Sequence, residues 1–144
     1  MSPRWSRAFR IFYWVIGRLD PMIRPLSNRV PIGNLAELAV TGWRSGRRRV
    51  VLIGLLRVDG VWYVGHPNGR ADWTRNLDAA RAATIRFSGH EPHSIRAELL
   101  PKGEERRRVI EITWHQQLFP GSILYWLARR HILAVGRYYR IELT

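Results

Sequence analysis

The chain has 144 residues and a mass of 16.9 kDa, which is the size of one domain. It contains no cysteine, which excludes disulfides, iron–sulfur clusters, thiolate zinc sites and a cysteine nucleophile, and its 46% apolar residues argue against a disordered chain. Twenty-four basic and 11 acidic residues give a formal charge of +13, so the surface is expected to attract nucleic acid, anionic lipid or a phosphorylated ligand.

The first predicted element is an amphipathic helix over residues 4–19. Apolar residues recur there at the i, i+3, i+4, i+7 spacing, and the arginines lie mainly off that stripe. Three prolines, Pro21, Pro25 and Pro31, are expected to turn the chain that follows into an irregular connector. Residues 1–34 are therefore predicted to be a helix with a connector, in front of a domain formed by residues 35–144.

Two strands and a hairpin are predicted next. A short strand at residues 35–40 leads into a basic loop, and residues 50–58 form a nearly unbroken apolar strand. The dipeptide Asp59-Gly60 is a strong two-residue hairpin signal, so the chain is expected to return in a strand at residues 61–64.

A turn, a helix and another strand pair follow. Residues 65–69 have turn chemistry, and Asp72 is expected to cap a helix that ends near Arg81. Residues 83–87 and 94–100 are predicted to form a second antiparallel pair.

The last third of the chain is predicted to be mostly helical. A charged helix is expected over residues 101–117 and a second one from Pro120-Gly121 to about Arg130, before a half-buried final strand at residues 139–143. About six strands joined mostly by hairpins predict a mainly β protein with helices (α+β), in the form of a small antiparallel barrel decorated by helices.

The strongest candidate site is the cationic loop at residues 41–49. It contains four arginines and no acid, and Gly42 and Gly46 allow the backbone to approach a ligand closely. Its amides and Ser45 can donate to phosphate oxygens, while arginine forks bind phosphate or carboxylate in pairs. The Gly-Lys-Ser/Thr ending of a nucleotide-binding P-loop is missing. An ordinary solvated hairpin loop is the alternative.

A second candidate site lies at residues 68–76, where a glycine-containing turn runs into a helix. Such a helix start presents free amides and the positive end of a dipole, which favours an anion. Trp73 and Asn76 are three residues apart and share a face, so the indole could wall a flat heteroaromatic ring while the amide fixes a polar edge. The alternative is that Trp73 belongs to the core and Asn76 pairs with backbone.

Metal and hydrolase chemistry have little support. The five histidines are scattered, and His90 and His93 have no third ligand at metal spacing, so no metal site is predicted. No nucleophile-elbow motif is present.

The first helix has two interpretations that the sequence leaves open. Its arginines and its aromatic residues suit the interfacial layer of an anionic membrane, and the same apolar stripe would also cover a barrel. The longest apolar run, residues 11–17, is too short to span a bilayer, and no export leader is recognisable. We therefore expect a cytoplasmic protein, with peripheral contact to the inner face of the membrane if this helix binds lipid.

The two candidate sites together resemble a known family. The order strand, Thr-Gly-x-Arg-Ser-Gly-x-x-Arg, apolar strand, hairpin, glycine turn and Trp-x-x-Asn-Leu helix is similar to that of the deazaflavin-dependent nitroreductases. These are actinobacterial split-barrel proteins that use coenzyme F-420, and the likeness covers residues 35–100 best. The resemblance implies a split β-barrel of flavin-reductase type with the coenzyme in a groove.

The resemblance also implies roles for individual residues. The loop arginines and serine match positions that bind the coenzyme's phosphate and oligoglutamate tail, and Tyr125 falls near a tyrosine that lines the substrate pocket, so it is the expected proton or hydrogen-bond donor. Trp43 stands where a basic residue is frequent, and Leu52 where a proline often follows the loop. The expected coenzyme contacts are Arg44, Ser45, Gly46, Arg49, Val51, Leu52, His66, Pro67, Asn68, Gly69, Trp73 and Asn76.

The leading hypothesis is therefore an oxidoreductase that uses reduced F-420 to transfer a hydride to a small hydrophobic acceptor such as a quinone or nitroaromatic. The protein would supply position, dryness and charge. Two alternatives stay open, namely a deazaflavin or other ligand carrier without turnover and a basic nucleic-acid-binding domain. RNP-type aromatic motifs, a recognition helix and zinc fingers are absent, so we expect no nucleic-acid partner. The oligomeric state is not predicted.

Overall fold

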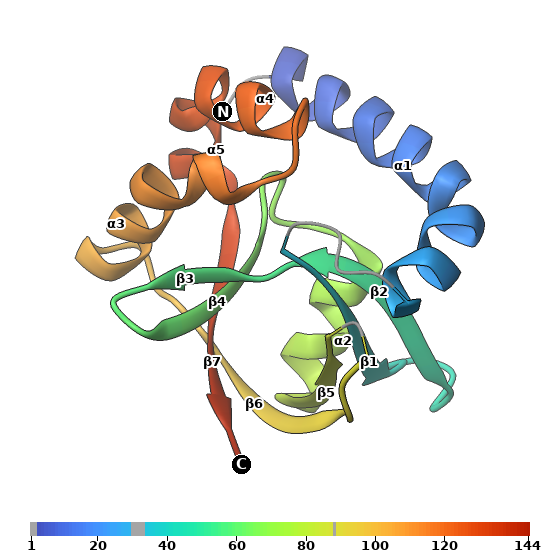
Figure 1. Ribbon diagram of the computed structural model, residues 1–144. Coiled ribbons are helices and arrows are strands. Elements are labelled where there is room, and N and C mark those ends of the chain that lie inside the picture. Colours follow the sequence, from blue (N-terminus) through green and yellow to red (C-terminus); the bar gives the residue numbers. More distant parts are fainter. Residues whose placement is uncertain (1–2, 30–33, 88) are drawn as a thin grey trace.

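The computed structural model describes residues 3–29, 34–87 and 89–144. Within them, seven strands form one antiparallel sheet that curls into a half-barrel (Figure 1). The order across the sheet is β2-β1-β5-β6-β7-β4-β3. The strands are β1 (Leu35–Thr41), β2 (Arg48–Gly54), β3 (Leu56–Val58), β4 (Val61–His66), β5 (Ala82–Arg86), β6 (His93–Leu99) and β7 (Arg137–Leu143).

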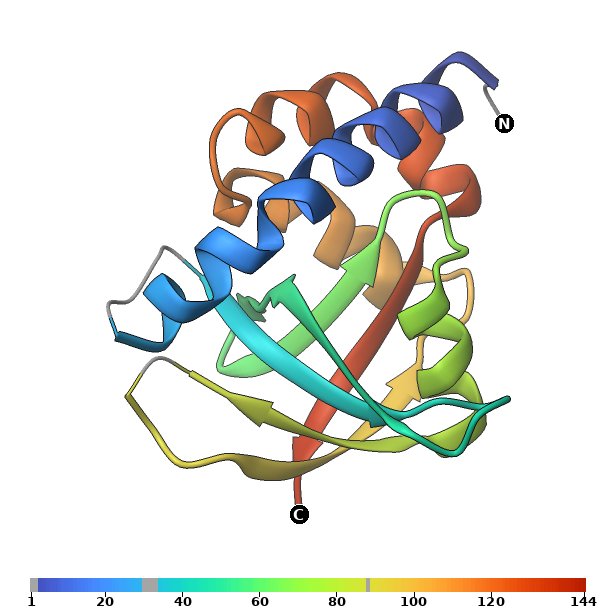
Figure 2. The ribbon, with the colours of Figure 1, turned by 90° about the vertical axis from the view of Figure 1, so that its right-hand side faces the viewer.

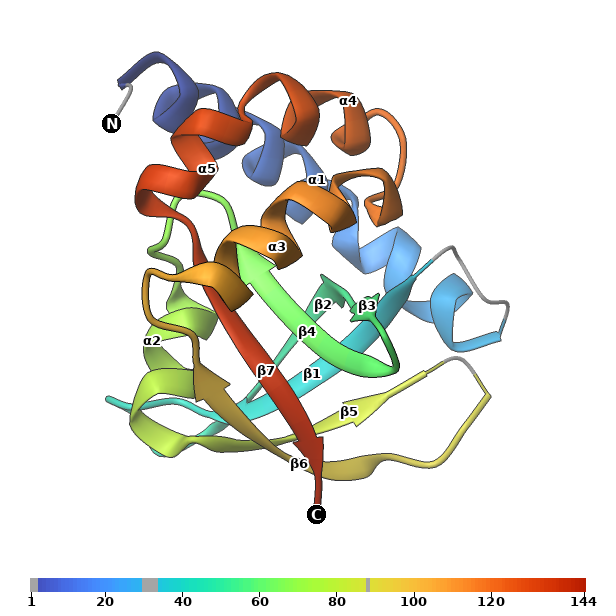
Figure 3. The same ribbon diagram turned by 90° about the vertical axis from the view of Figure 1, so that its left-hand side faces the viewer.

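The helices surround this sheet unevenly. Four of them gather at one end of the half-barrel, whereas α2 lies against its side (Figures 2 and 3). We call the end of the molecule with these four helices the helical pole. The opposite end, where the C-terminus lies, is formed by strands and is called the sheet pole. The helices are α1 (Pro3–Arg29), α2 (Asp72–Ala80), α3 (Glu104–Thr113), α4 (Gly121–Leu127) and α5 (Arg129–Val135), with a short 3₁₀ turn η1 (Trp114–Gln116).

The expected α+β split barrel is confirmed, with one strand more than predicted. The apolar run at residues 50–58 divides at Leu55 into β2, which pairs with β1, and β3, which pairs with β4. β2 and β3 occupy the two opposite edges of the sheet. Both strands bury apolar side chains and Leu55 between them is itself buried, so the break leaves no mark in the hydrophobic pattern.

The expected irregular connector after residue 19 is wrong. Helix α1 continues to Arg29 through Pro21 and Pro25, and Pro31 lies outside the described residues. A proline forfeits one backbone hydrogen bond, but its fixed φ of about −65° is itself helical, so a helix can pass through it.

Two apolar clusters form the core. One fills the half-barrel, and the other lies between the sheet and the helical pole. Phe9 of α1 is fully buried in the second cluster, together with Leu56 and Tyr138, so α1 contributes to the core of the protein.

The predicted cap of α2 is also corrected. The helix begins after Ala71, whose amide donates to Thr74 Oγ1 at 3.0 Å, and the Thr74 hydroxyl donates back to the Ala71 carbonyl at 2.8 Å. Asp72 lies in the first turn and is exposed. Ala71 is thus the N-cap, and the buried Thr74, three residues later, satisfies its amide in place of the expected Asp72 carboxylate.

The C-terminal helices are shorter than predicted. The charged helix begins at Glu104, and the predicted second helix is two, α4 and α5, separated at Ala128. The final strand has the expected alternation only at its centre: Tyr139 and Ile141 are buried, but Leu143 is exposed, and the strand begins two residues earlier than predicted, at Arg137, with Tyr138 also buried.

Candidate cofactor-binding site

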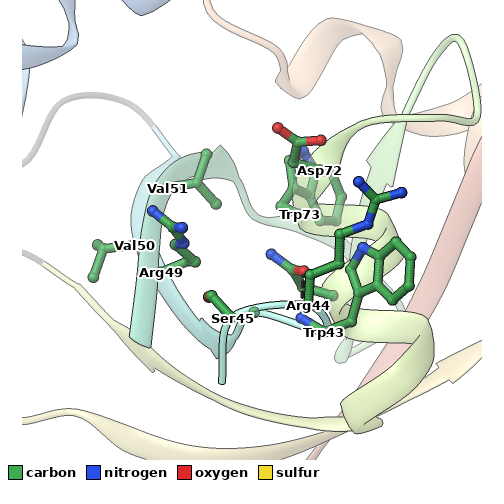
Figure 4. A pocket seen from close by; sticks show the side chains of 10 residues that line it. Trp43, Arg44, Ser45, Arg49, Val50, Val51, Asp72 and Trp73 are labelled. Carbon is green, nitrogen blue, oxygen red and sulfur yellow. Dashed lines mark hydrogen bonds between the residues drawn. The ribbon is translucent and has the colours of Figure 1, made fainter. Parts of the chain in front are cut away.

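A cavity of about 440 Å³ lies where the β1–β2 loop, β2 and the start of α2 meet (Figure 4). This volume is within the range of about 300–1,000 Å³ that is usual for small-molecule sites. Figure 4 shows Arg49 and Val51 on the strand side and Asp72 and Trp73 on the helix side. The lining residues are Gly42, Trp43, Arg44, Ser45, Arg49, Val50, Val51, Asp72, Trp73 and Asn76.

The cationic loop is a closed and rigid turn. The Gly42 amide donates to the Arg47 carbonyl at 2.8 Å, and the Gly46 amide donates back to the Gly42 carbonyl at 2.9 Å. Gly46 has φ +68°, a conformation in which a side chain is strained. The Arg47 amide donates to Ser45 Oγ at 3.2 Å. The Gly42, Gly46 and Arg47 amides are therefore used within the loop and cannot be part of the expected cradle of free amides.

Asn76 connects this loop to α2. Its side chain is buried, and Oδ1 accepts a hydrogen bond of 3.0 Å from the Trp43 amide. Asn76 therefore pairs with backbone, which was the alternative interpretation of this residue. The same side chain also lines the cavity. The bond sets the distance between the arginines of the loop and the indole of Trp73.

We expect Asn76→Leu to loosen the loop and Asn76→Asp to preserve it, because only the aspartate keeps an acceptor for the Trp43 amide. The loss of one hydrogen bond of about 1 kcal/mol corresponds to a decrease of about fivefold in affinity for a ligand held by the loop. Hydrogen exchange of the Trp43 amide measures the effect directly. Equal exchange rates in both variants would contradict the assigned role of the hydrogen bond between the Trp43 amide and Asn76.

The charges in the cavity are asymmetric. Arg44 and Arg49 are exposed and supply two guanidinium groups, against the single carboxylate of Asp72. The Arg44 guanidinium lies over the Trp43 ring, 4.6 Å from its centroid, which restrains it beside the cavity. Asp72 disfavours an anion at the start of α2, contrary to the second predicted anion site, so negative groups are better placed on the loop side.

Trp73 forms an apolar wall that is held from behind. It is half-buried against the barrel core, with its ring 6.2 Å from that of Tyr139 and 6.1 Å from that of His66. The Tyr139 hydroxyl donates to Asp78 of α2 at 2.6 Å, which fixes α2 on the sheet. Because the indole is already held in place, a flat ring could bind to its exposed side without first having to order the Trp73 side chain.

His66 lies behind the cavity wall. Its ring is buried, stacks on Tyr13 of α1 at 5.1 Å and accepts a hydrogen bond of 3.2 Å from the Asn68 amide at Nδ1. Burial lowers the pKa of the imidazole to about 4. The neutral ring is thus part of the packing between α1 and Trp73.

Acid should therefore destabilise the fold through His66. The unfolded histidine has a pKa of about 6.5 and the folded one about 4, so between these values the unfolded state binds the extra proton and stability falls as the pH drops. We expect a loss of about 3 kcal/mol between pH 7 and pH 4, absent in His66→Gln. Urea unfolding at both pH values measures it, and parallel pH profiles for the two proteins would refute it.

The predicted turn at Pro67, Asn68 and Gly69 is structural. The Asn68 amide group donates to the Ser6 carbonyl of α1 at 3.0 Å and its Oδ1 lies 2.9 Å from His131 Nε2. Gly69 has φ +79° and lies so close to α5 that a Cβ would be 2.2 Å from the Val135 carbonyl oxygen. None of the three lines the cavity.

Tyr125 and Leu52 also lie elsewhere. Tyr125 belongs to α4 and is buried against α1, where its hydroxyl hydrogen-bonds that of Tyr13. Burial raises the pKa of Tyr125 well above the usual value. The expected role of Tyr125 as a donor to substrate in this cavity therefore has to be withdrawn. Leu52 is on the face of β2 opposite the barrel core. Sequence likeness gave Tyr125 its place near the site, but it could not show that α1 covers it.

Four lining residues were missed: Gly42, Trp43, Val50 and Asp72. Trp43, Val50 and Asp72 are immediate neighbours of predicted contacts, and Gly42 lies in the predicted cationic loop, so contiguity would have found them. Asp72 was interpreted only as a cap. Among the described residues, no three His, Asp or Glu side chains come together as a metal site would require.

The fold is shared with solved structures, although no protein-family model matches the sequence and a search of curated proteins finds no similar chain. An F-420-H2 dependent reductase, FDR-A, is 17% identical, with 76% of this chain and 94% of that one aligned at a TM-score of 0.56. The haem storage protein HutZ from Vibrio cholerae is 16% identical over 88% and 90% of the two chains, with a TM-score of 0.59.

A third structure, an FAD-binding protein from Mesorhizobium loti, is 15% identical over 77% of this chain and 81% of its own, with a TM-score of 0.54. At such identities the likeness shows the fold alone. The chain has the split-barrel fold of flavin-binding proteins, and proteins with this fold also include haem-binding members. The ligand of this chain has to be inferred from its own cavity.

Proposed function

We propose that the chain is an oxidoreductase that binds reduced coenzyme F-420 in this cavity and passes its hydride to a small hydrophobic acceptor. The observation that carries the proposal is that Arg44 and Arg49 line the same cavity as Trp73 and Asn76, although the two groups lie about 25 residues apart in the sequence. An elongated ligand with an aromatic ring at one end and a negative tail at the other matches this combination.

The donor set fits the coenzyme part by part. The guanidinium groups of Arg44 and Arg49 and the Ser45 hydroxyl, all supplied by the β1–β2 loop and the start of β2, suit a phosphate and a chain of carboxylates. Trp73 and Val51 offer an apolar wall to the ring. When bound, the coenzyme supplies the hydride, and the protein's contribution is to hold the ring against this wall and exclude water from it. The solved F-420-H2 dependent reductase with this fold supports the same ligand class.

Diffuse positive charge explains the surface less well. Several arginines are paired with acids, among them Arg86 with Glu37 at 3.0 Å and Arg140 with Glu98 and Glu105 at 2.6 Å. Within the described part of the chain, neither Arg44 nor Arg49 forms an ion pair with an acid, and both line a cavity that also has an aromatic wall. This favours a discrete anionic ligand over a nucleic-acid duplex.

Calorimetric titration tests the ligand. Coenzyme F-420, flavin mononucleotide, haem and duplex DNA are each added to the purified protein at about 0.15 M salt, where weak surface attraction is screened. We expect the deazaflavin to bind most tightly. Tighter binding of any of the other three would overturn the assignment.

Turnover is tested separately. The protein is mixed with reduced F-420 and either a menaquinone analogue or a nitroaromatic compound, and the return of the oxidised coenzyme absorbance is followed. Oxidation that depends on both protein and acceptor is the expected result. Tight binding with no turnover for either acceptor would identify a carrier and contradict the enzyme.

A further inference from the structure

The outer surface of the helical pole is unusually apolar. Of the thirteen large apolar side chains that are exposed among the described residues, nine belong to α1, to α4 or to the segment just before α4. Trp14 is 62% exposed and Phe119 77%. We name this surface the α1–α4 face, and its exposed apolar residues are Ile11, Trp14, Val15, Leu118, Phe119, Ile123, Trp126 and Leu127; Ile16 is also exposed, but it follows Phe9 on the inward side of α1.

The α1–α4 face is one continuous layer. The two helices lie side by side at the same end of the molecule in all three ribbon views. Their inner sides are in contact, since the ring of Phe9 lies 5.4 Å from that of Tyr125, whose hydroxyl bonds Tyr13. Residues of the same helices that do not point inward are therefore on the outer side of a shared layer.

Cations accompany the aromatic residues of this face. The Arg18 guanidinium lies over the Trp14 ring at 4.8 Å, and that of Arg129 lies over the Trp126 ring at 5.1 Å. Arg4 and Arg7 are exposed on the ridge of α1 that carries Trp14 and Arg18, because residues 4, 7, 11, 14 and 18 are spaced by three or four.

Acidic residues are missing from the same segments. No Asp or Glu occurs at residues 1–19 or 112–141 of the sequence. A face with exposed tryptophans, arginines stacked on them and no acid matches the boundary layer of an anionic bilayer, where indoles lie at the headgroups and guanidiniums meet phosphates.

We propose that the α1–α4 face docks on the surface of an anionic membrane, with α1 lying in the interface. The face binds without crossing, as the described part of the chain holds no helix long and apolar enough to span a bilayer. The docking is separate from cofactor binding, because the cavity residues Arg44, Arg49 and Trp73 are not part of this face. It extends the role of the first helix to include α4 and Phe119.

Vesicle flotation tests the proposal. The protein is mixed at about 0.15 M salt with vesicles of phosphatidylcholine alone or with about 30% phosphatidylglycerol. We expect it to float with the anionic vesicles only. The double variant Trp14→Ser/Trp126→Ser should lower the partition coefficient by tenfold or more, since each indole buries a large apolar area. The double variant Arg18→Gln/Arg129→Gln should lower it by roughly fivefold or more.

Two matched controls lie on the sheet pole. Leu143 is 68% exposed at the end of β7, and Arg96 is exposed on β6. Leu143→Ser and Arg96→Gln should leave the partition coefficient unchanged. Circular dichroism melts verify that the tryptophan variant is folded.

Three results would overturn the docking. One is equal binding to neutral and anionic vesicles, and another is an equal loss in the controls. The third is a wild-type protein that is dimeric in light scattering and does not bind vesicles, together with a Trp14→Ser/Trp126→Ser variant that is monomeric. This result would show that a second copy of the chain covers the face.

Discussion

Replacing Arg44 and Arg49 together by glutamine is expected to weaken the binding of coenzyme F-420 by about 3–6 kcal/mol, or roughly 10²- to 10⁴-fold. Each exposed guanidinium lines the cavity, and each would lose a charge-assisted hydrogen bond of about 1.5–3 kcal/mol. Calorimetric titration measures the change. The free energy of unfolding should hardly change, because both side chains are exposed.

The same loop offers a control with equal charge. Arg47 and Arg48 are exposed and do not line this cavity, so Arg47→Gln/Arg48→Gln also removes two positive charges and should change the affinity little. If both double variants weaken binding equally, attraction by net charge is responsible and the cavity has no specific role. The comparison thus separates a built anion site from a positive surface.

Arg106→Met is expected to lower the free energy of unfolding by about 3–5 kcal/mol. The Arg106 guanidinium is buried beneath α5 and donates to three carbonyls, those of Ile132 at 3.1 Å, Leu133 at 2.8 Å and Gly136 at 2.7 Å. At the end of α5, the Leu133 and Gly136 oxygens would lose these charge-assisted bonds, each worth about 1.5–3 kcal/mol, and the Ile132 oxygen would keep only its bond from the Gly136 amide. Burial also lowers the pKa of this arginine.

Thermal and urea unfolding measure this effect, which corresponds to a decrease of about 10–20 °C in Tm. Arg107→Met is the control, since the neighbouring side chain is 64% exposed and pairs only with Glu111 on the helix surface. Similar melting temperatures for the two variants would show that the buried bonds contribute little. The position of α5 also concerns the site, because α5 packs against Gly69 in the turn before α2.

The relation between the two proposals is testable with the same variants. Arg44→Gln/Arg49→Gln should lose the coenzyme and still float with anionic vesicles, whereas Trp14→Ser/Trp126→Ser should do the reverse. If the proposed hydrophobic acceptor resides in the membrane, docking would bring the protein to it. Failure of one proposal leaves the other standing, because no residue is shared between the cavity and the α1–α4 face.

Local patterns determined much of this protein. Neighbouring residues determine the basic loop between two apolar strands, the Asp59-Gly60 hairpin and the final strand. Their turn chemistry and hydrophobic period can be recognised from the sequence alone. The α+β barrel follows from them. The residues around Arg44 and those around Trp73 were each recognisable for the same reason, as short motifs.

Only the tertiary structure decided how these motifs meet and which aromatic residues are buried. The bond from Trp43 to Asn76 joins two elements 33 residues apart, and α1 passes through two prolines and covers Tyr125. Such outcomes depend on which surfaces pack, since the free energy of burial is gained between segments distant in sequence and can outweigh local preferences. In the sequence, an aromatic residue of an apolar helix stripe cannot be distinguished from an aromatic residue of a binding site, because only the fold shows which of them faces the core.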